Sequence, residues 1–303
     1  MYGFWFKKTI FYGWDHILGL FLANVIYLAL MGSCLLWIYL HTKEVIGLPA
    51  ELLLTVASIL VCSFYTMVIA HYASKINDGA AKGRALEGAV NTVRSHIPHI
   101  LLHAFITTVI VVNIIYAIPF YMESQGFAGP MMAFVGLFLS IFLIANFKYY
   151  LPLCLMRPEE GVVDIVKYSF AYALDNKGVT FVLLLRSAAD LLISVPFAGI
   201  IPGFAGILVS DTCATDLLNR RYLLAEEKDT DKSAVTWDAT LDTLGGERAR
   251  VEKRRFLSLL FPDDKKISLW LIFACGLFHS REQKAKNRIV IREKQYGRIP
   301  FRN

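Results

Sequence analysis

The sequence predicts an all-α membrane protein, a polytopic bundle of about six transmembrane helices with interfacial helices and a basic cytoplasmic tail. Two features of composition indicate this class: 56% of the 303 residues are hydrophobic, and only 18% are charged. Because a soluble domain carries about 25% charged residues, the deficit excludes a disordered chain and most soluble enzymes. A mean hydropathy of +0.50 is instead typical of a protein whose apolar surface faces lipid.

Six apolar stretches are candidate spans, because about 20 apolar residues in a helix cross the hydrocarbon core of a bilayer. Four are long enough as they stand: residues 17–40, 52–73, 100–121 and 131–151. The next apolar stretch is too long for one helix, and it contains the helix-breaking sequence PFAGIIPG at residues 196–203. Division at this point predicts two shorter spans, residues 179–195 and 203–218.

The distribution of Lys and Arg among the loops predicts the orientation of the bundle. If both termini are cytoplasmic, the N-terminus and the loops on that side carry nine basic residues, and the opposite loops carry only Lys43. We therefore expect a multi-pass protein of the plasma membrane with both termini in the cytoplasm. The first apolar run is too long for a cleaved signal peptide, so it is expected to remain as an anchor.

Amphipathic patterns predict three helices at the membrane surface, at residues 2–12, 84–97 and 164–176. A division at residue 222 separates a transmembrane bundle, residues 1–222, from a cytoplasmic tail, residues 223–303. Residues 220–303 contain 19 basic and 12 acidic residues, a net charge of +7, whereas the preceding residues are nearly neutral. The excess positive charge therefore belongs to the tail.

The tail joins its positive charge to an apolar segment at residues 267–278 that is too short to span a membrane. This combination is typical of a segment that binds anionic lipid, a protein partner, or RNA including a ribosome. All three interpretations stay open. The residues expected to make the contacts are Lys265, Lys266, Trp270, Arg281, Lys284, Lys286, Arg288, Arg292 and Lys294.

Arg186 and Asp190 are four residues apart on one face of the fifth predicted span. Because an unpaired charge inside a bilayer is costly, the two side chains are expected to pair and to face the bundle interior. The pair could line an ion or solute path, bind a lipid headgroup, or only fix the packing of helices. The charged residues near the end of the sixth span are expected to be solvated: Asp211, Asp216, Arg220 and Arg221.

His96, His99 and His103 fall on one helical face, where imidazoles could bind zinc, copper or haem iron. No cysteine or carboxylate has the spacing to complete such a site, so we expect no metal and no cofactor. The sequence also lacks the phosphate-binding loop and the HExxH and GxSxG motifs. No enzymatic activity is therefore expected.

Residues 147–222 contain an aromatic, proline-ended stretch (FKYYLP), the sequence ALDN at 173–176, two closing spans and an Arg-Arg pair. Asn24 in the first span and residues 75–79 after the second span add to this pattern. Residues 10–222 thereby resemble the YesL-type integral membrane proteins. The resemblance implies a bacterial plasma-membrane protein, often associated with carbohydrate-uptake systems, and it implies no particular site residues.

Two classes of function follow from these observations. The first is a non-enzymatic membrane accessory or scaffold protein, whose cytoplasmic face and basic tail bind a partner. The second is a transporter or channel that uses the intramembrane pair Arg186 and Asp190. Both classes place the protein in contact with the lipid bilayer.

Overall fold

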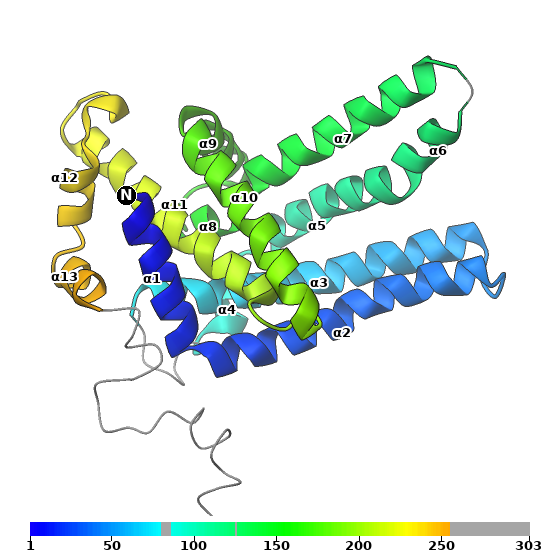
Figure 1. Ribbon diagram of the computed structural model, residues 1–303, viewed down its shortest axis with the longest axis horizontal. Helices are drawn as coiled ribbons and strands as arrows, with labels where there is room; N and C mark the ends of the chain where they lie inside the picture. Colours follow the sequence, from blue (N-terminus) through cyan, green and yellow to red (C-terminus); the bar gives the residue numbers. More distant parts are fainter. Residues whose placement is uncertain (80–85, 125, 255–303) are drawn as a thin grey trace, which may run out of the picture. The chain divides into compact units, whose positions relative to one another are not determined.

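Helices make up all the regular secondary structure of the described residues, which are 1–79, 86–124 and 126–254 (Figure 1). In this computed structural model the chain divides into two units, Met1–Val251 and Glu252–Asn303. The first unit contains the helical bundle. The prediction from composition, an all-α membrane bundle, is confirmed.

Five described helical segments are long and apolar enough to cross a membrane, and they coincide with the first five predicted spans. Two are single helices, α2 (Ile17–Thr42) and α3 (Leu48–Asn77). The other three combine shorter elements: α5 (Ile97–Val112) with the π-helix η1 (Asn113–Ala117) and α6 (Ile118–Glu123), α7 (Ala128–Phe147) with α8 (Tyr150–Met156), and α10 (Lys177–Ser194) with η2 (Val195–Phe197). These segments support a membrane location for the protein.

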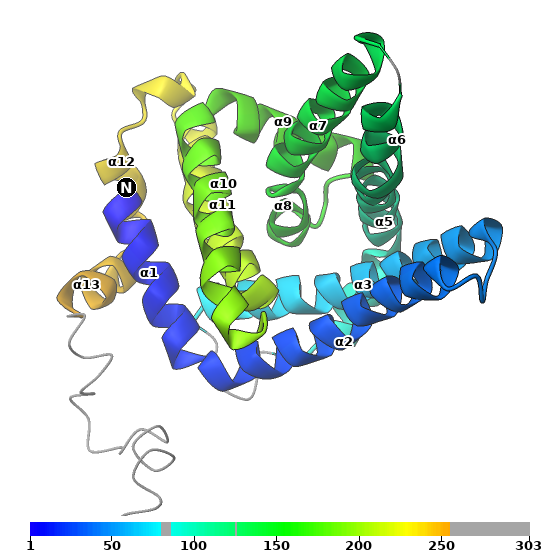
Figure 2. The same cartoon turned by 45° about the vertical axis from the view of Figure 1, so that its right-hand side comes forward.

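The sixth predicted span, residues 203–218, forms the first part of α11 (Gly203–Glu227), which is not among the five segments. Polar side chains in the middle of α11, including Ser210, Asp211 and Asp216, are buried against neighbouring helices rather than facing lipid. Helix α11 contacts α1 (Tyr2–Asp15), α2, α3, α8 and α10. It is therefore the central helix of the bundle, and it runs back beside α10 (Figure 2).

The connection between α10 and α11 is held by one buried side chain from α2. The Asn24 Nδ2 group donates to the carbonyl oxygens of Ile200 and Pro202, at 2.7 and 2.8 Å, and Asn24 Oδ1 accepts from the Ala205 N–H at 2.7 Å. Gly203 has φ +60°, and a Cβ atom at this position would lie 2.4 Å from Asn24 Nδ2. The helix-breaking sequence thus forms a tight turn that Asn24 holds by three hydrogen bonds and in which only glycine fits at residue 203.

Two of the segments predicted as surface helices form helices whose bounds differ slightly from the prediction. The N-terminal one is α1, and the segment predicted at 164–176 is α9 (Val162–Asp175). Of residues 84–97, only α4 (Ala89–Ser95) and the start of α5 are helical in the described part of the chain, and 84–85 lie outside it. Helix α1 packs on α11 through the buried side chains of Phe4, Trp5 and Phe11.

The chain after residue 222 continues the fold of the bundle. Helix α11 extends to Glu227, and α12 (Trp237–Asp242) and α13 (Gly246–Lys253) follow the 3-10 turn η3 (Lys232–Ala234). Leu241, Leu244 and Val251 belong to the same hydrophobic core as the transmembrane helices. Residues 223–251 are thus part of the compact unit rather than a separate segment.

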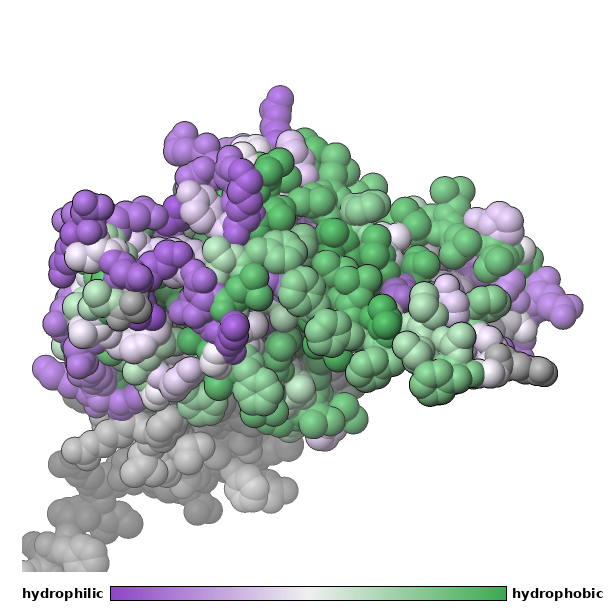
Figure 3. Space-filling model, turned by 90° about the horizontal axis from the view of Figure 1, so that it is seen from above, coloured by the Kyte–Doolittle hydropathy of each residue, from purple (hydrophilic) through white to green (hydrophobic). Residues whose placement is uncertain are grey.

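The surface of the unit carries an apolar zone between two polar ends. In the face shown in Figure 3, hydrophobic side chains cover the middle, and hydrophilic side chains gather at one end and, in smaller number, at the other. Large exposed side chains in the spans include Phe105, Phe134, Phe138, Phe181 and Leu192. A continuous exposed apolar surface of this kind is expected where lipid is the solvent.

Candidate functional site

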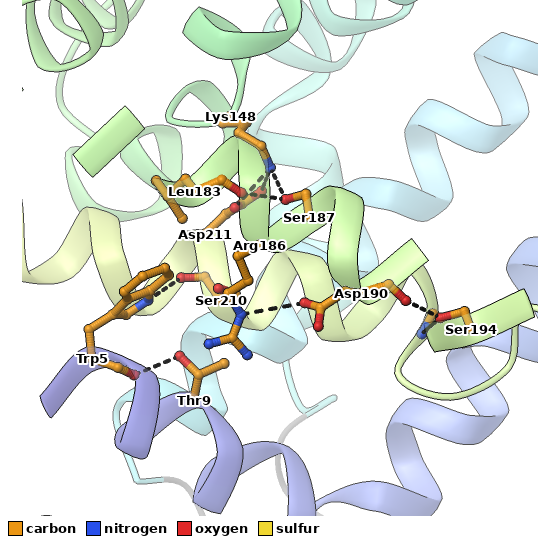
Figure 4. A network of polar contacts seen from close by, with 11 residues as sticks. Trp5, Thr9, Lys148, Leu183, Arg186, Ser187, Asp190, Ser194, Ser210 and Asp211 are labelled. Atoms are coloured by element: carbon orange, nitrogen blue, oxygen red, sulfur yellow. Dashed lines mark hydrogen bonds and ion pairs between the residues drawn. The ribbon is translucent and has the colours of Figure 1, made fainter. Parts of the chain in front are cut away.

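The candidate site is a set of buried and partly buried charged side chains where α1, α7, α10 and α11 meet (Figure 4). Charges inside a bilayer are rare and costly, so they mark either a function or a specific pairing. Arg186 and Asp190 come from α10, Asp211 comes from α11, and Lys148 follows directly after α7. Two cations and two anions therefore lie together at the central helix α11.

Lys148 and Asp211 form the most closely matched pair of the site. The Lys148 Nζ group lies 2.9 and 3.0 Å from the two carboxylate oxygens of Asp211 and donates to Ser187 Oγ at 2.6 Å. Both side chains are less than a tenth exposed. The contacts of Lys148 to both carboxylate oxygens and to a hydroxyl are hydrogen bonds that offset the free-energy cost of removing two charges from water.

Arg186 and Asp190 form a second pair on α10. The Arg186 Nε atom lies 3.4 Å from Asp190 Oδ2, and the guanidinium lies over the rings of Trp5 and Phe6, at 5.3 and 4.9 Å from their centroids. Trp5 is itself fixed, since its indole N–H donates to the Ser210 carbonyl at 3.0 Å. The Arg186 charge is thus stabilised by a carboxylate and by two aromatic faces.

Among the described residues, the Arg186 Nη1 atom is buried and has no hydrogen-bond partner. A buried donor without a partner costs about 1–3 kcal/mol. The hydrogen bonds of Arg186 are therefore less completely satisfied than those of Lys148 and Asp211, and its Nη1 atom remains an open donor.

A third cluster centres on Lys8 of α1, whose side chain is completely buried. Its Nζ atom lies 3.4 Å from Asp216 of α11 and 2.9 Å from Glu247 of α13. Arg220 also pairs with Asp216, at 2.9 Å. Burial lowers the pKa of Lys8, but the neighbouring Cys213, Asp216 and Glu247 outweigh it and raise that pKa above its usual value.

These pairs join helices that are far apart in the sequence. Lys148 and Asp211 connect the end of α7 to α11, and Lys8 connects α1 to both α11 and α13. Since each of these cations has an anion within 4 Å, the charges are largely neutralised inside the protein. Such contacts hold helices in one arrangement, because breaking a pair leaves an uncompensated buried charge.

The expectation that Asp211 and Asp216 are solvated was wrong, because their residues are only 4% and 7% exposed. Sequence reasoning also missed Lys148 as a partner of Asp211. A signal was present: Lys148 is the lone charge within the predicted span 131–151, and opposite charges in different spans of one bundle are expected to pair. Lys8 offered no such signal, since a lysine in an interfacial helix normally reaches water.

The three histidines of α5 and its N-cap do not converge on a common point. Each ring forms a different contact: His96 Nδ1 with the Thr92 carbonyl, His99 Nδ1 with the Tyr150 hydroxyl, and His103 Nδ1 with the Ser63 hydroxyl. No group of three or more His, Cys, Asp or Glu residues in the described part of the chain could hold a metal ion.

A groove of about 520 Å³ lies at the polar end of the unit, between the end of α9 and the residues that follow α11. Asp175 lies in it and accepts hydrogen bonds from Lys232 and Tyr222, both at 2.8 Å. The hydrogen bonds from Lys232 and Tyr222 lower the pKa of the Asp175 carboxyl below its usual value. The groove is thus lined by charges that already have partners.

The predicted contact residues of the tail lie outside the described residues: Lys265, Lys266, Trp270, Arg281, Lys284, Lys286, Arg288, Arg292 and Lys294.

Fold and site together define an all-α integral membrane protein with a central polar helix held by buried ion pairs. Comparisons of the chain with protein-family models, curated proteins and solved structures found no match.

Proposed function

We propose that this protein is a non-enzymatic scaffold of the membrane, whose polar end and basic C-terminal segment bind a partner. The observation that carries the proposal is the cluster around Lys8. A fully buried lysine holds Glu247 of α13, the helix that leads into the basic segment, against α1 and α11. The last described helix of the chain is thus attached to α1 through a buried ion pair.

The pairing of the buried charges also supports a scaffold. Lys148 and Lys8 each lie within 4 Å of a carboxylate on another helix, so their charges hold helices together, whereas Arg186 pairs with Asp190 within α10. A scaffold requires that its helices keep one arrangement while the attached segment binds. The groove at Asp175 lies at the same polar end, where Lys232 already pairs with its carboxylate.

The charge of the C-terminal segment favours a negatively charged partner. Residues 281–303 alone contain eight basic and two acidic residues. Basic segments bind anionic surfaces through many contacts that weaken with salt, whether the surface is a protein, RNA or a membrane. The partner is therefore defined by its negative charge, and the experiment below identifies its class.

The test compares three forms of the protein purified from native membranes by gentle detergent extraction. The first is the full chain, and the second ends after residue 254, where the compact unit is complete. The third neutralises five basic residues as Lys284→Gln, Lys286→Gln, Arg288→Gln, Arg292→Gln and Lys294→Gln. We expect a protein or nucleic acid to remain bound to the full chain and to be lost from both variants.

A matched control carries Lys167→Gln and Lys177→Gln, which remove two exposed basic residues from the bundle itself. It is expected to retain the partner at the wild-type level. Recovery of the same proteins and nucleic acids from all four forms contradicts the proposal. Loss of only anionic lipid from the two tail variants identifies a membrane surface as the partner.

We also propose that both ends of the protein are cytoplasmic and that the membrane is a bacterial plasma membrane. The charge of the loops supports this orientation, and so does the contact of Lys8 with Glu247, which places both ends of the compact unit together. The resemblance to YesL-type proteins and a link to carbohydrate uptake stay predictions. A cysteine at Lys43, reacted with a membrane-impermeant maleimide in intact cells, tests the orientation: absence of labelling contradicts it.

A second candidate function is transport through the bundle. The open position at Arg186 Nη1 favours it, since a buried guanidinium with a free donor can bind an anionic group. Ion or solute flux in proteoliposomes that is lost with Arg186→Leu and Asp190→Leu together, and kept with Lys167→Gln, supports transport. Equal flux in the double variant removes the pair from any transport mechanism.

A further inference from the structure

Three sulfur atoms lie together between α2 and α3, two spans that pack along each other (Figure 1, Figure 2). Met31 and Cys34 are three residues apart in α2 and therefore share one face of that helix. Cys62 comes from the middle of α3. These three residues are called the sulfur cluster below. The cluster is separate from the ion pairs around α11.

The Cys62 thiol contacts the other two sulfur atoms of the cluster. Its Sγ atom donates toward Met31 Sδ at a distance of 3.9 Å, and it is also hydrogen-bonded to the Cys34 thiol. Both cysteines are free and buried, whereas Met31 is 36% exposed. The cluster is thus enclosed around its thiols and reaches the surface of the bundle through Met31.

The spacing of the sulfur atoms matches that of ligands around a single metal ion. Metal–thiolate bonds are about 2.3 Å long, so three sulfurs in a plane around one ion lie about 4 Å apart. The distance of 3.9 Å between Cys62 Sγ and Met31 Sδ already has this value. An ion between the sulfurs would therefore replace the thiol hydrogens without a large movement of either helix.

Two thiols and one thioether define the kind of ion that fits. Zinc is held by three or four ligands from Cys, His, Asp and Glu. Within the described residues, no three such side chains lie close enough together to hold one ion. Magnesium and calcium require oxygen ligands. Cysteine and methionine sulfurs are soft ligands that select Cu(I), so the cluster favours this ion.

Polar groups beside Cys34 are arranged to support a thiolate, which is the form of cysteine that binds metals. Ser58 of α3 forms a hydrogen bond with the Cys34 sulfur. The Ser58 Oγ atom also accepts from the Trp37 indole N–H at 2.9 Å, so the hydroxyl hydrogen remains available for the sulfur. Hydrogen bonds to metal ligands typically change the affinity for the metal about 10- to 100-fold. Trp37 and Ser58 are therefore suited to hold Cys34 as a ligand.

We propose that Met31, Cys34 and Cys62 form a binding site for one Cu(I) ion between α2 and α3. When the ion binds, the S–H bonds of both cysteines break, the two protons pass to water, and two copper–sulfur bonds form. Met31 Sδ donates a lone pair as the third ligand. Copper remains Cu(I), and no residue is oxidised. This site is additional to the proposed scaffold function and is independent of the C-terminal segment.

The test measures the transfer of Cu(I) to the purified full-length protein from the chelator bathocuproine disulfonate, with ascorbate present and oxygen excluded. We expect Cys34→Ser and Cys62→Ser to weaken Cu(I) binding about a hundredfold or more, because each removes a thiolate ligand, and Met31→Leu to weaken it about tenfold. The matched control, Cys154→Ser, changes a free, buried cysteine outside the cluster and is expected to bind Cu(I) as the wild type does.

The proposal is overturned if the wild type takes up no Cu(I), or if Cys34→Ser and Cys62→Ser bind it as tightly as the wild type. Equal weakening in Cys154→Ser also overturns it, since binding would then not depend on this cluster. X-ray absorption of the copper-loaded wild type gives a second test that requires no variant to fold. We expect sulfur neighbours at about 2.3 Å from copper, and a shell of nitrogen and oxygen alone contradicts the site.

Discussion

The Lys148–Asp211 pair illustrates how buried charges shape this protein at the scale of single residues. Lys148 Nζ contacts both carboxylate oxygens of Asp211, and both side chains are almost completely excluded from solvent. The stability of such a pair depends on having both partners, because either charge alone would be left in a region of low dielectric constant. The pair is therefore suited to a double-mutant cycle.

We expect Lys148→Met and Asp211→Asn each to lower the free energy of unfolding by about 3–5 kcal/mol, because each leaves one buried charge unpaired. The double variant is expected to lose less than the sum of the two single changes. Thermal unfolding in detergent measures these differences. Lys43→Met, which removes an exposed lysine, serves as the control and is expected to have little effect. Strict additivity of the two single changes contradicts a specific pairing.

Asp175 gives a prediction about pH. The hydrogen bonds from Lys232 and Tyr222 lower the pKa of Asp175, so its ionised form stabilises the fold. This contribution is complete above the ordinary Asp pKa of 3.8 and is lost as the pH falls through the lower pKa of the folded state. The melting temperature of Asp175→Asn is expected to lie slightly below that of the wild type at neutral pH.

The difference between the wild type and Asp175→Asn is expected to be small, because the Asp175 side chain is 47% exposed. It should shrink as the pH is lowered below 3.8. Asp238→Asn, at a side chain that is 87% exposed, provides the comparison. A difference that stays constant down to the most acid pH would rule out this linkage.

At the scale of elements, the turn between α10 and α11 depends on a close approach of Gly203 to Asn24. Gly203→Ala would introduce a Cβ atom 2.4 Å from Asn24 Nδ2, at a residue with φ +60°. We expect it to destabilise the protein by more than 1 kcal/mol, at least the ordinary cost of a non-glycine residue in a left-handed conformation. The melting temperature and the resistance to proteolysis measure the effect.

Gly32 offers a matched control for this substitution. It lies within α2, and a Cβ atom there would meet no other atom within 4 Å. Gly32→Ala is therefore expected to be neutral or slightly stabilising. Equal melting temperatures for Gly203→Ala and Gly32→Ala would show that the turn does not require glycine.

The spans could be predicted because length and hydropathy are local properties of the sequence. The same reasoning predicted a sixth span at residues 203–218, but it could not show that other helices enclose this segment. Asp211 lies in an apolar stretch and pairs with a residue 63 positions away. Pairing over that distance depends on which helices are neighbours, and hydrophobic periodicity does not contain this information.

The hydrogen bond from the Tyr116 hydroxyl to the buried Glu51 carboxylate could not be predicted from the sequence, for a similar reason. Glu51 stands at the start of a helix, where an acidic residue is ordinary and normally solvated. In the structure it is buried, and Tyr116 donates to it from η1, a π-helical turn in another span. No local sequence pattern indicates a single π-turn, so this contact is evident only from the three-dimensional structure.

At the scale of the whole molecule, the structure locates the end of the compact unit at Val251. A chain that ends after residue 254 keeps Leu241, Leu244 and Val251 in the hydrophobic core. We expect it to melt at the wild-type temperature. A chain that ends after residue 222 loses these side chains and also Glu247, the partner of Lys8. It is expected to be strongly destabilised or not to accumulate in the membrane.

The two truncations separate the contribution of residues 223–254 from that of the rest of the chain. A stable protein ending at residue 222 would contradict the packing of α12 and α13 on the bundle. Equal loss of stability in both truncations would assign a structural role to the residues after 254.

The central proposal, that the basic C-terminal segment binds a negatively charged partner, is tested most directly by photo-crosslinking in intact membranes. A photoreactive amino acid replaces Trp270, next to the predicted basic contacts. Our account predicts one discrete crosslinked product, which disappears when Lys284, Lys286, Arg288, Arg292 and Lys294 are changed to Gln. No crosslinked product, or one that persists unchanged in the five-fold variant, would contradict it.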